Sequence, residues 1–230
     1  MIKECDELPP TLWHNPRMKF RDLLPYMGLL VLALAVGVLA GYLTFNSRRP
    51  PPPHTDALLL HAPKALPDFT LTDTMAKTLD KDRLMGRWSL LYFGYTHCPD
   101  ACPTTLAALD KMQRYLANLP QDKRPQVYFI SVDPKRDDPK LLGDYTLYFN
   151  SDFVAATGSL ENLRALMGPL DLEFSYDKPD AKGDYGVNHS TAVILVDPEA
   201  EETALFVPPL DPKRMASDYA NILKYYGEQF

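Results

Sequence analysis

The residues with the clearest capacity for chemistry are two cysteines, Cys98 and Cys102, separated by three residues. They follow the uncharged apolar run 90–95 and precede apolar residues at helical spacing from 106 to 119. The pair is therefore expected in a loop that joins a buried strand to a helix. The free N–H groups at a helix start favour a thiolate over a thiol. The two sulfurs could form a disulfide, or bind one metal ion at about 2.3 Å each.

His189 is a third candidate ligand, because it lies in a polar loop shortly before the apolar run 192–196. If that run forms a strand beside the 90–95 strand, His189 faces the cysteine loop. Two thiolates and one imidazole suit copper, since sulfur favours Cu(I) and imidazole also accepts Cu(II), whereas zinc usually requires a fourth ligand. The alternative is a histidine that makes only a local hydrogen bond in a turn, and spacing leaves both interpretations open.

Two neighbouring features are interpreted as structural. The side chain of His97 is expected to point away from Cys98, as adjacent residues do in extended chain. The segment Asp133-Pro134-Lys135-Arg136-Asp137 follows a second apolar strand and is interpreted as a turn with an aspartate cap. The alternative is that its charges attract a partner or support the copper site from behind its ligands.

The remaining pattern predicts an α/β layer fold, because strands alternate with helices and a hairpin and a helix close the chain. Strands are expected at 68–73, 90–95, 126–133, 153–157, 192–196 and 204–207. Helices are expected after Pro103, from Asp138-Pro139 with Leu141, Leu142, Tyr145 and Phe149 inward, over 160–167, and from Asp211-Pro212.

Composition excludes several classes of function. The 230 residues carry a net charge of −6, with no basic cluster, glycine-rich phosphate loop or tandem repeat. A nucleic-acid or nucleotide-binding protein is therefore not expected. The length accommodates a membrane anchor and one soluble domain.

The segment 23–46 is predicted to be a single transmembrane helix, because it lacks charged residues and is long enough to cross a bilayer. A cleaved signal peptide is the alternative, but its apolar core would span only roughly 7–15 residues. Lysine and arginine number four before the helix (Lys3, Arg17, Lys19, Arg21) and two after it (Arg48, Arg49). This balance places 1–22, with Cys5, in the cytoplasm and the Cys98–Cys102 pair outside, which is the periplasm in a bacterium.

A proline-rich linker is predicted over 47–65, since four consecutive prolines at 50–53 favour extended chain over a packed element. His54 and His61 are interpreted as solvated linker histidines. The folded domain is therefore expected over 66–230.

The motifs together resemble the Sco/SenC family of copper proteins, in order, over about residues 66 to 228. The resemblance is carried by three stretches: Tyr92-Phe93-Gly94-Tyr95-Thr96-His97-Cys98-Pro99-Asp100-Ala101-Cys102-Pro103-Thr104-Thr105-Leu106, Ile130-Ser131-Val132-Asp133-Pro134-Lys135-Arg136-Asp137, and His189-Ser190. It implies a thioredoxin-like fold tethered to the bacterial inner membrane. It also implies copper binding through Cys98, Cys102 and His189, and a partner in the binuclear CuA centre of cytochrome c oxidase.

Two positions depart from the usual pattern of that family. Ala76 stands where an early hairpin often has glycine, and the turn 197–202 lacks the glycine often found there. Both changes concern turns, so they affect expected loop shape and leave the ligand set intact.

Three functions are compatible with these residues. The first is a copper metallochaperone, which needs no turnover and takes copper from a periplasmic donor. The second is a thiol–disulfide oxidoreductase that keeps a partner's copper-site cysteines reduced, although redox enzymes of thioredoxin type carry C-x-x-C and this chain has C-x-x-x-C. The third is a redox or copper sensor. The sequence does not decide whether the protein is an enzyme.

Overall fold

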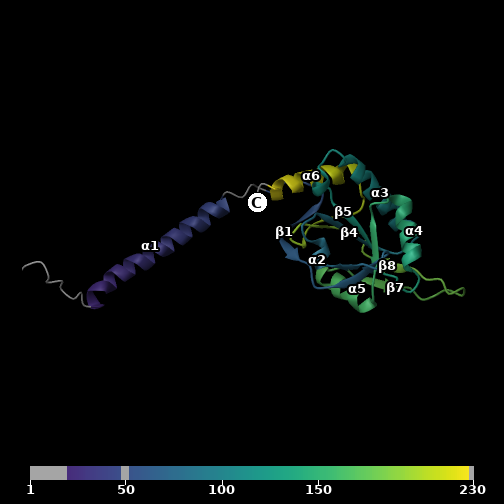
Figure 1. Ribbon diagram of the computed structural model, residues 1–230, viewed down its shortest axis with the longest axis horizontal. Helices are drawn as coiled ribbons and strands as arrows, with labels where there is room; N and C mark the ends of the chain where they lie inside the picture. The colour runs from purple at the N-terminus through teal and green to yellow at the C-terminus, as the bar shows by residue number, and fades with distance from the viewer. Residues whose placement is uncertain (1–19, 48–51, 228–230) are drawn as a thin grey trace, which may run out of the picture. The chain divides into compact units, whose positions relative to one another are not determined.

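The computed structural model describes residues 20–47 and 52–227 and divides into two units, Met1–Pro51 and Pro52–Phe230 (Figure 1). In the first unit, helix α1 spans Phe20–Ser47 and covers the segment 23–46 that the sequence predicts as helical. Among the described residues, no helix combines the length and the apolarity that crossing a membrane requires. Most of the predicted cytoplasmic segment 1–22, with Cys5, lies outside the described residues.

The second unit is built on an eight-stranded sheet with the order β1-β10-β9-β4-β5-β6-β2-β3. The strands are β1 Leu58–Ala65, β2 Thr70–Asp73, β3 Thr78–Asp80, β4 Ser89–Gly94, β5 Gln126–Ser131, β6 Val154–Thr157, β9 Val193–Val196 and β10 Glu201–Phe206. Strands β4, β5 and β6 are parallel to one another, and the other neighbours pair antiparallel. Every residue of β4 is buried, which confirms the prediction of a strand covered on both faces.

Helices connect the parallel strands and cover the sheet. Their bounds are α2 Lys81–Leu84, α3 Ala101–Tyr115, α4 Pro139–Phe149, α5 Leu160–Met167 and α6 Pro212–Gly227, with short 3₁₀ turns η1 Gln121–Lys123 and η2 Gly168–Leu170. Helix α3 packs against both α4 and α6, and Figure 1 shows α5 on the other side of the strands from α3 and α6. The predicted α/β layer fold is therefore confirmed.

The predicted linker over 47–65 is wrong at its carboxyl end, because 58–65 forms strand β1 at the edge of the sheet. Leu58 pairs with Leu205 and Ala65 pairs with Glu201. The pairing register shifts between Leu59 and Lys64, the stretch that contains Pro63. A proline cannot donate to a ladder and is tolerated at an irregular edge strand, which is why proline content misled the sequence interpretation.

Two shorter predictions also need correction. Leu141 was expected to face inward, but it is partly exposed on α4. The loop before β9 was expected to be irregular, yet it contains a separate two-stranded sheet of β7 Phe174–Tyr176 and β8 Val187–His189. Strands of three residues are too short for an alternation pattern to be visible in a sequence. The second strand of this pair carries His189.

Candidate metal centre

The site lies at the edge of the sheet where β4 ends. Strand β9 pairs antiparallel with β4, with Val193 opposite Tyr92, so β9 begins at the edge where β4 hands over to the cysteine loop. This confirms the predicted neighbourhood of the two strands. His189 lies four residues before β9 and is thereby brought to the same edge as Cys98 and Cys102.

The cysteine loop ends in the first turn of α3. The helix begins at Ala101, so Cys102 and Pro103 are its second and third residues, and the helix begins earlier than the sequence interpretation placed it. The Asp100 side chain makes no capping hydrogen bond. Instead the Cys98 sulfur accepts the backbone N–H of Cys102 at 3.3 Å. This hydrogen bond takes the place of a helix cap at the start of α3.

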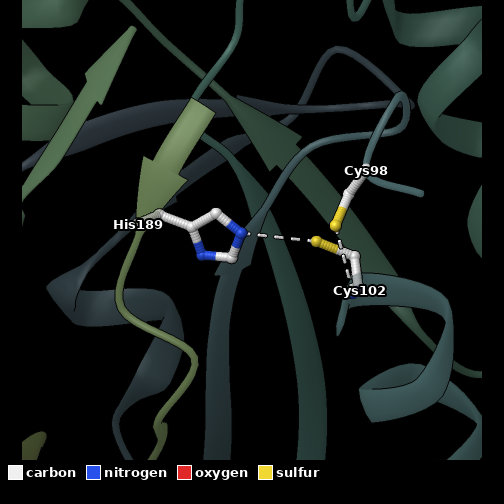
Figure 2. A group of neighbouring side chains, drawn as sticks. All are labelled: Cys98, Cys102 and His189. Carbon is white, nitrogen blue, oxygen red and sulfur yellow. Dashed lines mark hydrogen bonds between the residues drawn. The ribbon is translucent and has the colours of Figure 1, made fainter. Parts of the chain in front are cut away.

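The three predicted ligands converge, as Figure 2 shows. The Cys102 Sγ atom lies 3.5 Å from His189 Nε2, and the two sulfurs and one ring nitrogen lie within 4.8 Å of one another. Both thiols are free. One ion bound at about 2.3 Å from sulfur and about 2.0 Å from nitrogen needs sulfurs no more than about 4.6 Å apart. The donor set therefore fits a single soft metal ion after at most a small shift.

His189 is prepared to bind through Nε2. Its Nδ1 atom lies 2.8 Å from the Ser190 carbonyl oxygen, which assigns the ring proton to Nδ1 and leaves the Nε2 lone pair facing Cys102. Tyr92 and Tyr95 pack against the imidazole with ring centroids 6.4 and 5.8 Å away and hold its plane. Burial lowers the pKa of His189, so the imidazole is neutral at neutral pH.

The two cysteines differ in exposure. Cys102 is fully buried, and this burial raises the pKa of its thiol to about 12. Cys98 is only half-buried and is the sulfur within reach of a partner. A metal ion that binds Cys102 must displace the thiol proton, whereas Cys98 is placed for exchange with an incoming ligand.

Gly94 is a site residue that the sequence interpretation missed. A Cβ atom at this position would lie 2.8 Å from Cys102 Sγ and 2.8 Å from Phe129 Cε2. Only glycine lets the end of β4 pass this close to the buried thiol. The available signal was a glycine at the end of an otherwise apolar strand directly before a cysteine loop.

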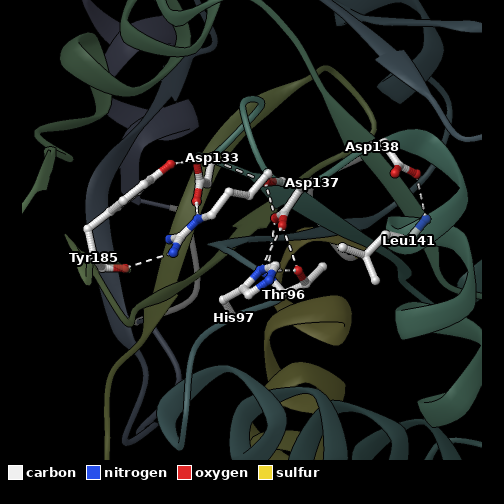
Figure 3. A network of polar contacts seen from close by, with 9 residues as sticks. Thr96, His97, Asp133, Asp137, Asp138, Leu141 and Tyr185 are labelled. Carbon is white, nitrogen blue, oxygen red and sulfur yellow. Dashed lines mark hydrogen bonds and ion pairs between the residues drawn. The ribbon is translucent and has the colours of Figure 1, made fainter. Parts of the chain in front are cut away.

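The segment after β5 supports the site from behind. Asp137 accepts hydrogen bonds from Thr96, the first residue of the cysteine loop. The His97 ring turns toward the same carboxylate, with its Nδ1 atom 3.7 Å from Asp137 Oδ1 (Figure 3). His97 is not part of the ligand cluster. Asp138 caps α4 by accepting the Leu141 N–H, so the predicted helix start at Asp138-Pro139 is confirmed.

The sequence profile of the SCO1/SenC family matches residues 60–224. This chain belongs to the SCO1/SenC family. Among its relatives, an SCO2-like protein from Rickettsia felis is 30% identical over 190 residues, which cover 81% of this chain and 92% of that protein. A candidate copper-binding protein from Stutzerimonas stutzeri is 36% identical over 173 residues, which cover 74% of this chain and 81% of the relative.

Solved structures share the SCO1/SenC fold. Arabidopsis thaliana ScoI with copper bound has a TM-score of 0.64 at 27% identity, covering 71% of this chain and 98% of the other. Yeast Sco1 with copper bound has a TM-score of 0.65 at 28% identity, covering 70% and 90%. These likenesses confirm the thioredoxin-like fold with a central sheet that the resemblance implies.

The two departures from the SCO1/SenC pattern fall at turns with unusual backbone. Ala76 and Ala200 both have a φ of 58°, in the left-handed region that favours glycine. Each follows an aspartate by three residues, Asp73 and Asp197, whose Oδ1 atoms accept two backbone N–H groups of the turn. The alanines therefore change local strain and leave the turn geometry in place.

Proposed function

We propose that this SCO1/SenC protein is a copper metallochaperone that holds copper between Cys98, Cys102 and His189. The observation that carries the proposal is the convergence of two free sulfurs and the Nε2 atom within 4.8 Å of one another. Solved relatives with copper bound support copper as the metal. The donor set supports it too, because thiolate stabilises Cu(I) and imidazole accommodates both oxidation states.

Release of copper follows from the difference between the cysteines. Cys102 is fully buried, so this sulfur is placed to retain the ion. The half-buried Cys98 lies at the rim and is the ligand that a partner thiolate can replace first. Copper then passes to the partner by stepwise exchange of one ligand at a time, and its oxidation state does not change.

The recipient proposed for this copper is the CuA centre of cytochrome c oxidase, with a periplasmic protein as copper donor. The family resemblance supports this assignment. We further propose that 23–46 anchors the protein in a bacterial inner membrane, with 1–22 cytoplasmic and the second unit periplasmic. The absence of charge from 23–46 and the excess of lysine and arginine before it support this orientation.

Copper binding tests the ligand set directly. The full chain in detergent, reduced and anaerobic, is titrated with Cu(I) against a competing chromogenic chelator and, separately, with Cu(II) under an absorption spectrometer. We expect one copper per chain, sulfur-to-copper charge-transfer absorption that is lost in Cys98→Ser, and an affinity at least tenfold lower in His189→Ala. His61→Ala, which changes an exposed histidine on β1, is the matched control. Unchanged affinity in His189→Ala would contradict the ligand set.

A second function is supported by the same sulfurs. A Cys98 thiolate capped by a helix N-terminus can attack a partner disulfide, and Cys102 can then displace the partner thiol. Two electrons and two protons pass to the partner, Cys98 and Cys102 become a disulfide, and an external dithiol reductant must restore them. His189→Ala separates the two functions, because it should weaken copper binding while leaving stoichiometric disulfide reduction unchanged.

A further inference from the structure

The two halves of the proposed copper site belong to different sheets. Cys98 and Cys102 follow β4 of the eight-stranded sheet, whereas His189 ends β8 of the separate two-stranded sheet. Within residues 52–227, no strand ladder joins the two sheets. The short link from His189 to β9 brings the histidine to this edge, and side-chain contacts that fasten the β7–β8 hairpin to the larger sheet help to fix its 3.5 Å distance from Cys102.

Arg136 makes several of these contacts, with Asp133 and Tyr185, which Figure 3 labels. Its Nη1 atom donates to the Tyr185 carbonyl oxygen at 2.9 Å, and its guanidinium carbon lies 3.6 Å from the centroid of the Tyr185 ring. Its Nε atom donates to Asp133 Oδ2 at 2.5 Å, and the Tyr185 hydroxyl donates to Asp133 Oδ1 at 2.9 Å. Arginine, aspartate and tyrosine thus form a closed triangle, which we call the Arg136 clamp.

The clamp connects a rigid element to the histidine strand. Asp133 and Arg136 lie in the segment after β5, a central strand of the larger sheet that ends at Ser131, and the Asp133 carboxylate is fully buried. Tyr185 lies two residues before β8. The ion pair lies within the 133–136 segment and orients the carboxylate and the guanidinium, and it is their hydrogen bonds to the Tyr185 hydroxyl and carbonyl that fix the hairpin. Only arginine has a planar guanidinium that can stack on the Tyr185 ring and donate hydrogen bonds to two different acceptors at the same time.

A second path runs from the clamp to the imidazole itself. The Tyr95 ring lies 5.7 Å from the Arg136 guanidinium carbon and 5.8 Å from the His189 ring centroid. Tyr95 is buried at the end of β4, so it is held on both sides. The hairpin is also tied at β7, where the Tyr176 hydroxyl donates to the Val132 carbonyl oxygen at 2.6 Å.

We propose that Arg136 is a positioning residue that holds His189 at copper-binding distance from the cysteines. It touches neither copper nor the sulfurs and acts only through Tyr185 and Tyr95 on the histidine strand. The inference rests on the proposed function, because it concerns the ligand set Cys98, Cys102 and His189. It adds that the segment 133–137 decides whether the histidine can complete that set.

The test is a double-mutant cycle on the full chain in detergent, with Cu(I) affinity measured by chelator competition. Arg136→Gln should weaken Cu(I) binding about tenfold. Lys135→Gln, which removes the neighbouring exposed positive charge, should leave the affinity within twofold of the parent. In a His189→Ala background Arg136→Gln should have no further effect, because the ligand through which it acts is absent. The rate at which oxidant closes the Cys98–Cys102 disulfide should not change in Arg136→Gln.

Tyr185→Leu removes the ring and hydroxyl but leaves the arginine in place, and it serves if Arg136→Gln does not fold. It should also weaken Cu(I) binding in the parent and not in His189→Ala. Equal loss in both backgrounds would overturn the inference, because a general loosening of the domain is independent of the histidine. A parent affinity that His189→Ala leaves unchanged would instead overturn the proposed ligand set. The two failures are therefore distinguishable.

Discussion

Thr96 and Asp137 are joined by two hydrogen bonds across 41 residues of sequence. The Thr96 backbone N–H donates to Asp137 Oδ2 at 3.0 Å, and the Thr96 hydroxyl donates to Oδ1 at 2.6 Å. The buried Ser131 hydroxyl donates to the same carboxylate at 2.5 Å. The start of the cysteine loop is therefore fixed to the end of β5, the strand whose continuation also forms the Arg136 clamp.

Asp137→Asn should loosen the cysteine loop, because an amide offers one acceptor oxygen where the carboxylate serves three donors. We expect the free energy of unfolding to fall by about 2 kcal/mol and Cys98 to react faster with a thiol reagent. Urea unfolding and the rate of alkylation measure the two effects. Asp144→Asn, in an exposed ion pair on α4, is the control and should change neither quantity. An alkylation rate equal to that of the parent would refute the anchoring role.

Gly94→Ala should disturb the buried thiol, because the new Cβ atom would meet Cys102 Sγ and Phe129 at 2.8 Å. Overpacking of this kind costs about 1–3 kcal/mol of stability, and displacement of the sulfur should also weaken copper binding. Gly143→Ala in α4 is the matched control, since its Cβ would make only ordinary contact with Thr74. That control should gain about 0.5–1 kcal/mol from helix propensity. Thermal unfolding and copper titration of both variants check the prediction, which fails if Gly94→Ala binds copper normally.

Ala76→Gly should stabilise the protein, because a left-handed backbone costs an L-residue about 1–2 kcal/mol and glycine nothing. The greater flexibility of unfolded glycine offsets part of this, which leaves about 0.5–1 kcal/mol. Ala200→Gly relieves the same strain but also removes a fully buried methyl group worth about 0.8 kcal/mol, so it should be close to neutral. Ala108→Gly in α3 should destabilise. Chemical unfolding ranks the free energies of unfolding of the three variants, and a loss of stability in Ala76→Gly would show that the backbone at Ala76 is not strained.

Asp73 and Asp197 occupy the same position in similar turns, but their contributions to folding stability should change with pH in opposite directions. Burial raises the pKa of Asp197 to about 6, above the unfolded value of about 3.9. The folded state then binds more protons than the unfolded chain between about pH 4 and pH 6, so the contribution of Asp197 to stability falls as pH rises through that window. Burial opposes the shift at Asp73, but hydrogen bonds from the Lys77 and Met75 backbone and the Arg83 guanidinium hold its pKa below the usual value. The stability from Asp73 is present at neutral pH and lost only as pH falls through the lowered pKa.

Urea unfolding of Asp197→Asn and Asp73→Asn at pH 4 to 7 tests this contrast. Relative to the parent, Asp197→Asn should gain stability as pH rises from about 4 to 6, whereas Asp73→Asn should be less stable than the parent at pH 7 and keep most of that deficit down to pH 4, because the lowered pKa of Asp73 lies below this range. Parallel pH profiles for the two variants would contradict the assignment. The comparison uses matched turns, so general effects of net charge cancel.

Copper affinity should rise with pH. Because burial raises the pKa of Cys102 to about 12, its thiol is protonated at neutral pH and releases that proton on binding copper. The logarithm of the apparent association constant should therefore increase by at least about 1 per pH unit between pH 6 and 8. Burial lowers the pKa of His189, which reduces the contribution of this ring to the slope. Chelator competition at several pH values measures the slope, and a flat profile would mean that Cys102 is not a ligand.

Much of the site can be predicted from the sequence, because local residue patterns determine the elements that carry the two cysteines. The uncharged run before Cys98 predicts a buried strand, the spacing after Cys102 predicts a helix, and their junction holds the sulfurs. These are consequences of neighbouring residues alone, and the structure confirms them. The edge strand β1 was missed because Pro63 made a paired segment resemble extended linker, and local composition cannot show a partner strand some 140 residues away.

What the sequence determined by itself is the α/β fold class, the cysteine pair at a strand-to-helix junction, and the identity of His189 as a possible third ligand. Only the tertiary structure decided that His189 Nε2 lies 3.5 Å from Cys102, that Gly94 makes room for the thiol, and that Arg136 and Asp137 fasten the two halves of the site. The physical reason is that strand and helix formation depend on near neighbours, whereas the site depends on pairing between segments far apart in the chain. Spacing along a sequence carries no record of which distant carboxylate or ring completes each contact.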